Sequence, residues 1–107
     1  MALDIFNARQ KHIADVFKSV ALPEKVAILE YIFATKDPTK YEIIHDLGLA
    51  PAEASFYLNE LEDFGIIQTK ENLPVKRYCM NTGRWEDYQS LINTFFDRHR
   101  TSLGKCC

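Results

Sequence analysis

Four cationic side chains lie between residues 40 and 77, together with a serine, an asparagine and an aromatic residue at helical spacing. Lysine and arginine neutralise phosphate groups, serine and asparagine hydrogen-bond phosphates or base edges, and an aromatic ring can touch the methyl group of thymine. These residue types therefore predict a surface that contacts duplex DNA. The candidates are Lys40, Ser55, Phe56, Asn59, Lys70, Lys76 and Arg77. The alternative is that they are ordinary solvated side chains.

A short helix over Lys40–Leu47 is predicted to begin the unit that carries these residues. Thr39 and Glu42 have the spacing of a capping box, in which each side chain accepts a hydrogen bond from the backbone of the other. Gly48 supplies a residue that ends a helix in the left-handed conformation without a Cβ penalty. Pro51 follows where a helix tolerates proline best, at its first position. We therefore expect two helices joined by a short turn.

The second helix of this unit is predicted over Pro51–Phe64. Its apolar residues recur at spacings of three and four, so they form one buried stripe. The stripe consists of Ala54, Tyr57, Leu58 and Leu61. The opposite face consists of Ala52, Phe56, Asn59 and Asp63.

Two strands are predicted after this helix, over residues 66–70 and Val75–Met80, with a turn between them. Alternation along the second strand places Tyr78 and Met80 on the face that anchors the hairpin to the core. Arg77 and Cys79 lie on the opposite face, toward solvent. This order predicts a mostly α-helical winged helix-turn-helix, with five helices and a two-stranded wing.

Two amphipathic segments flank this unit, one over residues 5–20 and a stronger one near the C-terminal end. A small core cannot cover both of them, so we expect a two-fold homodimer in which they pack against their mates. The residues expected at this interface are Phe6, Ile13, Phe17, Trp85, Tyr88, Leu91, Ile92, Phe95 and Phe96. Such a dimer presents two reading helices about one DNA turn apart, which suits a palindromic operator. The alternative is that both segments only complete the core of the monomer.

Three stretches of the chain resemble the ArsR-type (arsenic repressor) winged-helix regulators of bacteria. Residues 17–29 resemble the helix that leads into the family's DNA-binding unit, and residues 49–67 resemble its recognition helix. Val75–Met80 resembles its second wing strand. The likeness covers roughly residues 13–96. It implies a dimeric DNA-binding transcriptional regulator, and a repressor in particular.

The chain departs from the family pattern at two places. The recognition helix contains no lysine or arginine and has four carboxylates, Glu53, Glu60, Glu62 and Asp63. An acidic helix beside a duplex opposes binding, because attraction to phosphates supplies much of the affinity. A winged-helix module that binds a protein partner is therefore the alternative function. Classical metal sensors of the family carry a cysteine pair where this chain has 43–45, Ile-Ile-His, so we expect no metal site and no cofactor.

The composition sets the remaining limits. The chain has 107 residues, which predicts one domain over 1–107. Hydrophobic residues make up 47% of it, and the formal net charge is −2. No apolar run approaches a membrane span and no signal peptide is visible, so we expect a soluble cytoplasmic protein that does not contact membranes. No phosphate loop, zinc motif or nucleophile elbow is present, so an enzyme is not expected.

The three cysteines are Cys79 on the wing and Cys106 and Cys107 at the C-terminal end. A bond between the last two is not expected, because neighbouring α-carbons, about 3.8 Å apart, are closer than in an ordinary disulfide. The thiols could still bind a soft metal or metalloid, or respond to an oxidant. The alternative is a frayed tail that carries ordinary reduced thiols.

Overall fold

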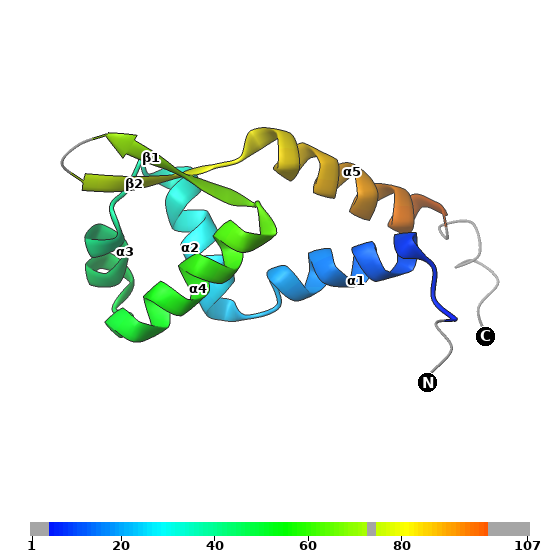
Figure 1. The fold of residues 1–107 in the computed structure, drawn as a ribbon, viewed down its shortest axis with the longest axis horizontal. Coiled ribbons are helices and arrows are strands. Elements are labelled where there is room, and N and C mark those ends of the chain that lie inside the picture. The colour runs from blue at the N-terminus through cyan, green and yellow to red at the C-terminus, as the bar shows by residue number, and fades with distance from the viewer. Residues whose placement is uncertain (1–4, 73–74, 99–107) are drawn as a thin grey trace.

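The structure is a computed structural model, and it describes residues 5–72 and 75–98. Five helices and two antiparallel strands follow one another in this part of the chain, as the sequence predicts (Figure 1). The elements are α1 (Ala8–Ser19), α2 (Pro23–Ala34), α3 (Lys40–Leu47), α4 (Pro51–Phe64), β1 (Ile67–Asn72), β2 (Val75–Met80) and α5 (Thr82–Arg98).

Local signals in the sequence set the ends of the central helices. The backbone N–H of Glu42 donates to the Thr39 hydroxyl and that of Thr39 donates to the Glu42 carboxylate, which forms the expected capping box. Gly48 and Gly65 end α3 and α4 with φ of 68° and 87°, in the left-handed region that favours glycine. Pro51 occupies the first turn of α4. The predicted bounds of α3, α4 and β2 are therefore confirmed.

Four predicted boundaries differ from the observed ones, among them the end of the first strand, at Asn72 rather than residue 70, and the end of the first helix, at Ser19 rather than residue 20. The first wing strand begins at Ile67 rather than at residue 66, because the N–H of Ile66 bonds the Leu61 carbonyl and closes the end of α4. The first helix begins at Ala8 rather than at residue 5. The reason is a second capping box, formed by Asn7 and Gln10, which starts the helix later.

The core lies where α2, α3, α4 and the hairpin meet. Its fully buried side chains come from all of these elements: Ile28, Ile43, Leu58, Leu61, Ile66 and Ile67. Tyr78 is buried and Met80 packs against the same cluster, so the wing is anchored as predicted. Burial of a large aliphatic side chain is worth about 1.5–3 kcal/mol, so this core holds α4 and the wing in a defined relation.

Helices α1 and α5 lie on the side of the molecule away from α3 and the tip of the hairpin (Figure 1). They contact each other through aromatic rings, with His12 against Tyr88 and Phe17 against Phe95. The N-terminal end of α5 also touches α2, where the rings of Phe33 and Trp85 are 5.0 Å apart. Among the described residues, no helix is long and apolar enough to cross a membrane.

Candidate nucleic-acid interface

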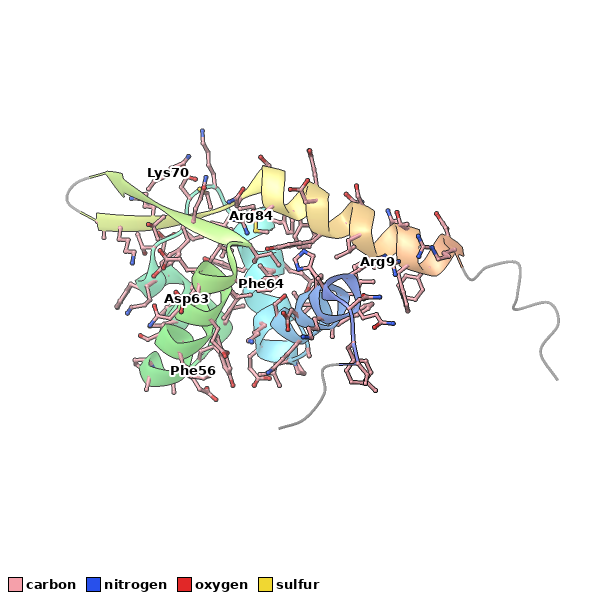
Figure 2. All side chains as sticks on the ribbon, turned by 45° about the vertical axis from the view of Figure 1, so that its right-hand side comes forward. Arg9, Phe56, Asp63, Phe64, Lys70 and Arg84 are labelled. Atoms are coloured by element: carbon pink, nitrogen blue, oxygen red, sulfur yellow. The ribbon has the colours of Figure 1, made fainter. Side chains whose placement is uncertain are left out.

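The outward face of α4 is the face that the sequence predicts. Ala54, Leu58 and Leu61 are fully buried, whereas Phe56, on the opposite side, exposes 58% of its surface. Figure 2 shows Phe56 at one end of the helix and Asp63 toward the other. The outward ridge of Ala52, Phe56, Asn59 and Asp63 is exposed, and so are Glu53 and Glu60 beside it. Three of the four carboxylates of α4 are therefore exposed.

Two side chains of α4 contact α2. On the flank toward α2, Glu60 pairs with Lys25 at 3.0 Å, and the side chain of Lys25 is only 8% exposed. The Tyr57 hydroxyl donates to Glu24 at 3.2 Å on the same flank. Burial and this carboxylate raise the pKa of Tyr57, so the phenol remains a donor. These contacts fix α4 against α2.

The flank of α4 toward the wing carries Ser55 and Glu62. Lys40, from the start of α3, donates to the Ser55 hydroxyl at 2.9 Å. Lys76, from β2, lies 3.9 Å from the Glu62 carboxylate, at the outer limit of an ion pair. The predicted acidic character of α4 is retained, and two of its carboxylates, Glu60 and Glu62, lie within ion-pair distance of a lysine.

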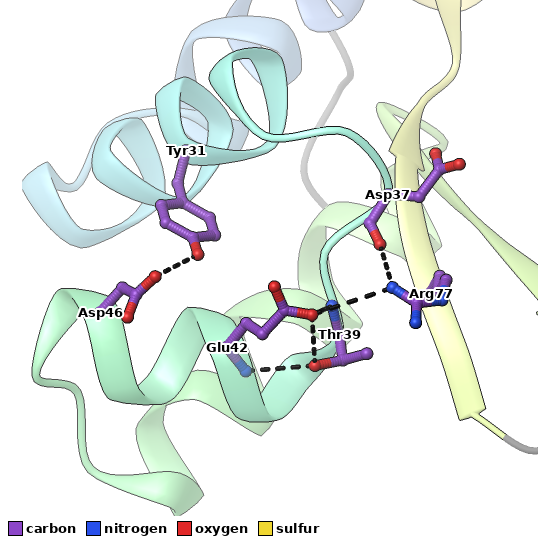
Figure 3. Close-up of polar contacts among 6 residues, drawn as sticks. All are labelled: Tyr31, Asp37, Thr39, Glu42, Asp46 and Arg77. Carbon is purple, nitrogen blue, oxygen red and sulfur yellow. Dashed lines mark hydrogen bonds and ion pairs between the residues drawn. The ribbon is translucent and has the colours of Figure 1, made fainter.

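Two of the wing cations, Lys70 and Arg77, lie opposite each other across the hairpin, and both contact Asp37; Figure 3 shows the contacts of Arg77. Lys70 pairs with the Asp37 carboxylate at 3.1 Å. The Arg77 guanidinium donates to the Asp37 carbonyl at 3.0 Å and lies 3.8 Å from Glu42 of α3. A backbone bridge joins Thr39 to Arg77 in addition. Lys70 and Arg77 thus connect the wing to the segment before α3.

Lys40 and Lys76 meet at a hollow of about 230 Å³ between α3, α4 and the wing. Its lining residues are Thr39, Lys40, Tyr41, Asn59, Val75, Lys76 and Tyr78. The Lys76 ammonium also lies 5.7 Å from the centre of the Tyr78 ring. The partner of Lys40 is a neutral hydroxyl and that of Lys76 is a distant carboxylate. Two positive charges therefore border one hollow.

A polar network on α3 was not predicted from the sequence. The Tyr31 hydroxyl donates to the Asp46 carboxylate, and the His45 ring lies 3.0 Å from the same carboxylate (Figure 3 draws the first contact). Hydrogen bonds from His45 and then Tyr31 lower the pKa of Asp46. The Tyr41 ring is 77% exposed and stacks on His45. Tyr41 also borders the hollow, and neither alternation nor helical spacing in the sequence predicts this position.

The residues expected at a dimer interface fall into two groups. Ile13 and Tyr88 are buried within the monomer, so their surfaces are already covered here. Trp85, Leu91 and Ile92 pack against the core and are half-buried. The second group contains the aromatic residues Phe6, Phe17, Phe95 and Phe96, of which all but the half-buried Phe95 are exposed. An exposed apolar stripe on α2 was missed by the sequence analysis, and its members are Leu22, Val26 and Phe33.

Cys79 is half-buried on β2, rather than on an open solvent face as predicted, and it has a free thiol. The other two cysteines, Cys106 and Cys107, lie outside the described residues. Within residues 5–72 and 75–98, no cluster of histidine, cysteine, aspartate and glutamate could hold a metal ion.

These elements define a winged helix-turn-helix: α3, a short turn and α4, followed by a hairpin wing. No protein-family model and no curated protein sequence matches the chain. Solved structures with this fold do match it, and they include transcriptional regulators of the ArsR type.

An ArsR-like transcriptional regulator from Rhodococcus sp. RHA1 superimposes with a TM-score of 0.73 at 16% identity, over 92% of this chain and 95% of that one. The transcriptional repressor BigR from Xylella fastidiosa gives a TM-score of 0.64 at 17% identity, over 81% and 86% of the two chains. A mutant of MepR from S. aureus bound to an oligodeoxyribonucleotide gives 0.57 at 15% identity, over 92% and 76%. At these identities the likeness is one of fold.

Proposed function

We propose that the protein is a DNA-binding transcriptional regulator of the ArsR type and acts as a repressor. The observation that carries this proposal is the hollow beside α4. Lys40 and Lys76 both line it, next to the exposed Asn59. In this proposal Phe56 and Asn59 face base edges in a major groove, and the two lysines face the phosphates at the groove's edge.

The wing cations have different functions in this proposal. Lys40 and Lys76 neutralise phosphates, because both line the hollow beside α4 and are exposed. Lys70 and Arg77 set the angle of the wing through Asp37, and their contacts with DNA are secondary. Ser55 positions Lys40 through its hydroxyl and can itself reach a phosphate when the lysine moves to one.

The regulator acts as a homodimer built on α1 and α5. Phe6, Phe17 and Phe96 expose large apolar rings that a monomer leaves in water, and Phe95 packs beside them. Burial of such rings against a second copy supplies much of the driving force for association. A two-fold axis there gives two copies of α4 and a palindromic operator. A cytoplasmic location follows from this function.

The thiols provide a regulatory input in the same proposal. Cys106 and Cys107 bind a soft metalloid or react with an oxidant, and the protein then leaves its operator. The half-buried Cys79 is the weaker candidate, because reaction needs an accessible thiolate.

A selection of bound sequences from a random pool of duplexes tests the function directly. We expect an inverted repeat with half-sites about one helical turn apart, bound by a dimer in sedimentation equilibrium. The affinity for that duplex should fall steeply between about 50 and 200 mM salt. Enrichment of no sequence, together with salt-independent weak binding, would contradict the proposal.

A second candidate function is supported by the exposed aromatic rings. Phe56 on α4 and Tyr41 on α3 present apolar surface on the face that contacts DNA in the first proposal. Exposed aromatic residues are also typical anchors of protein interfaces. In this alternative the winged helix binds a protein partner, and Phe56→Ala weakens that complex in a pull-down in which no duplex competes.

A further inference from the structure

A cavity of about 260 Å³ lies between α1 and α5, on the opposite side of the core from the lysine hollow. Its floor is buried and consists of Val16, Ile66 and Tyr88. Its rim is half-buried or exposed and consists of Phe17, Val20, Trp85, Gln89, Ile92 and Asn93. The contacts with DNA proposed above do not use this cavity, whereas Phe17 on its rim belongs to the proposed dimer interface.

The lining indicates which ligand chemistry fits. Apolar side chains form the floor and most of the rim, and no charged residue lines the cavity. Gln89 and Asn93 are one helical turn apart on α5, so their amides can hydrogen-bond one polar group at the mouth. An apolar cavity of roughly 150 Å³ accommodates benzene, so this larger one has room for a molecule of two rings. A neutral bicyclic aromatic with one hydroxyl or carbonyl group has the required character.

The floor of the cavity is connected to the end of α4. The Tyr88 hydroxyl donates to the Phe64 carbonyl at 2.9 Å, and the two rings are 4.9 Å apart. Arg84 donates to the same hydroxyl at 3.3 Å, and Figure 2 shows Arg84 and Phe64 close to each other. Ile66 is the residue that follows the Gly65 turn and precedes β1. A ligand that displaces Tyr88 or Ile66 therefore perturbs the junction between the reading helix and the wing.

We propose that this cavity is an effector site for a small, neutral aromatic molecule, and that occupancy is transmitted to the C-terminal end of α4 through Tyr88. The transmission to α4 rests on the proposed function, because a movement of α4 changes DNA binding only if α4 contacts DNA. The site differs from the thiols in chemistry. Of the exposed aromatic rings that we assign to the dimer, Phe17 lies on its rim, so a second copy covers part of the rim and leaves the buried floor in place.

The chain contains a single tryptophan, Trp85, which lies on the rim of the cavity. Its indole signal should therefore change when a ligand binds there, with no added fluorescent label. The experiment titrates the full chain with 2-naphthol and follows the Trp85 indole N–H in a ¹H–¹⁵N spectrum. We expect saturable movement with a Kd of about 0.1 mM, which is reasonable for roughly ten heavy atoms. The backbone amides of Gly65 and Ile66 should move with the same Kd. In Tyr88→Phe, 2-naphthol should still bind, but the shift at Gly65 should fall by at least about half.

A matched pair of variants locates the bound molecule. Val20→Phe fills the cavity and should weaken 2-naphthol at least tenfold, whereas Val26→Phe makes the same change on α2 outside the cavity and should leave the Kd unchanged. Gln89→Ala alters only an exposed amide and should weaken binding about fivefold if that amide bonds the hydroxyl.

Three results overturn the proposal. They are a Trp85 signal that does not respond at millimolar 2-naphthol, equal effects of Val20→Phe and Val26→Phe, and an apparent Kd that rises in proportion to protein concentration. The last result means that a second copy fills the cavity. Each spectrum is recorded without DNA. Failure to bind any duplex therefore contradicts the regulator function and leaves the test of the cavity intact.

Discussion

Replacement of Lys76 by alanine tests the assignment of the phosphate contacts. Lys76 borders the hollow beside α4, and its ammonium lies 3.9 Å from the Glu62 carboxylate. Lys70, from the other wing strand, pairs with Asp37 at 3.1 Å. The two lysines thus have the same charge and similar exposure, but only Lys76 is placed to bind a phosphate. Lys70→Ala is the matched control for Lys76→Ala.

The magnitude follows from counterion release. Each phosphate contact contributes about 0.9 to the slope of log affinity against log salt concentration, and a symmetric dimer makes the Lys76 contact twice. The slope should therefore decrease by about 1.8 in Lys76→Ala. Between 50 and 200 mM salt, a fourfold change, the advantage of the unmodified protein over the variant should shrink by about 12-fold.

Fluorescence anisotropy with the selected duplex at three or more salt concentrations provides the measurement. Lys70→Ala should change the slope by less than about 0.5, because its ammonium is already paired. If Lys70→Ala lowers the slope as much as Lys76→Ala does, the division of the wing cations is wrong. An unchanged slope in Lys76→Ala has the same meaning.

Three further predictions concern stability, specificity and regulation. Glu60→Gln leaves the buried Lys25 ammonium without its charged partner. We expect the free energy of unfolding in urea titrations to fall by about 1–2 kcal/mol. This loss is smaller than for a fully buried pair, because the Glu60 side chain is 42% exposed. Phe56→Ala should lower the preference for the selected duplex over an unrelated one by about tenfold and leave the salt slope unchanged, in competition assays. An altered slope would place Phe56 among the residues that set the backbone contacts. Cys106→Ser combined with Cys107→Ser should abolish release from DNA by oxidant or arsenite; unchanged release would exclude these thiols as the sensor.

The central helices could be predicted from the sequence because their ends are encoded locally. The Thr39 capping box, Gly48, Pro51 and Gly65 act within one turn of chain, and the tertiary structure does not override them. Periodicity likewise predicts the buried residues Ala54, Leu58 and Leu61 of α4 and the anchoring of Tyr78, whereas Tyr57, predicted in the same stripe, is half-buried. These features depend on residues that are close in sequence, so the sequence alone is sufficient to predict them.

The charge distribution could not be predicted, because it depends on the angles at which elements pack. Lys25 and Glu60 are far apart in sequence, and their pairing follows from the crossing of α2 and α4. The same holds for Lys70 and Asp37, where a wing cation meets the segment before α3. Helix periodicity places the carboxylates around α4, but it does not show which of them meet lysines. The cavity between α1 and α5 likewise depends on the crossing of two distant helices.

The two-stranded sheet has a consequence for the handling of this protein. One edge of β2 is covered where Tyr78 bonds the Pro38 carbonyl, whereas β1 pairs only with β2 in the described part of the chain. The outer edge of β1 therefore offers free backbone groups to which another chain could add as a strand. Charged side chains on an edge strand, lysine in particular, discourage such addition. Lys70 lies on this strand, so its removal should lower solubility on storage even where DNA binding is unaffected.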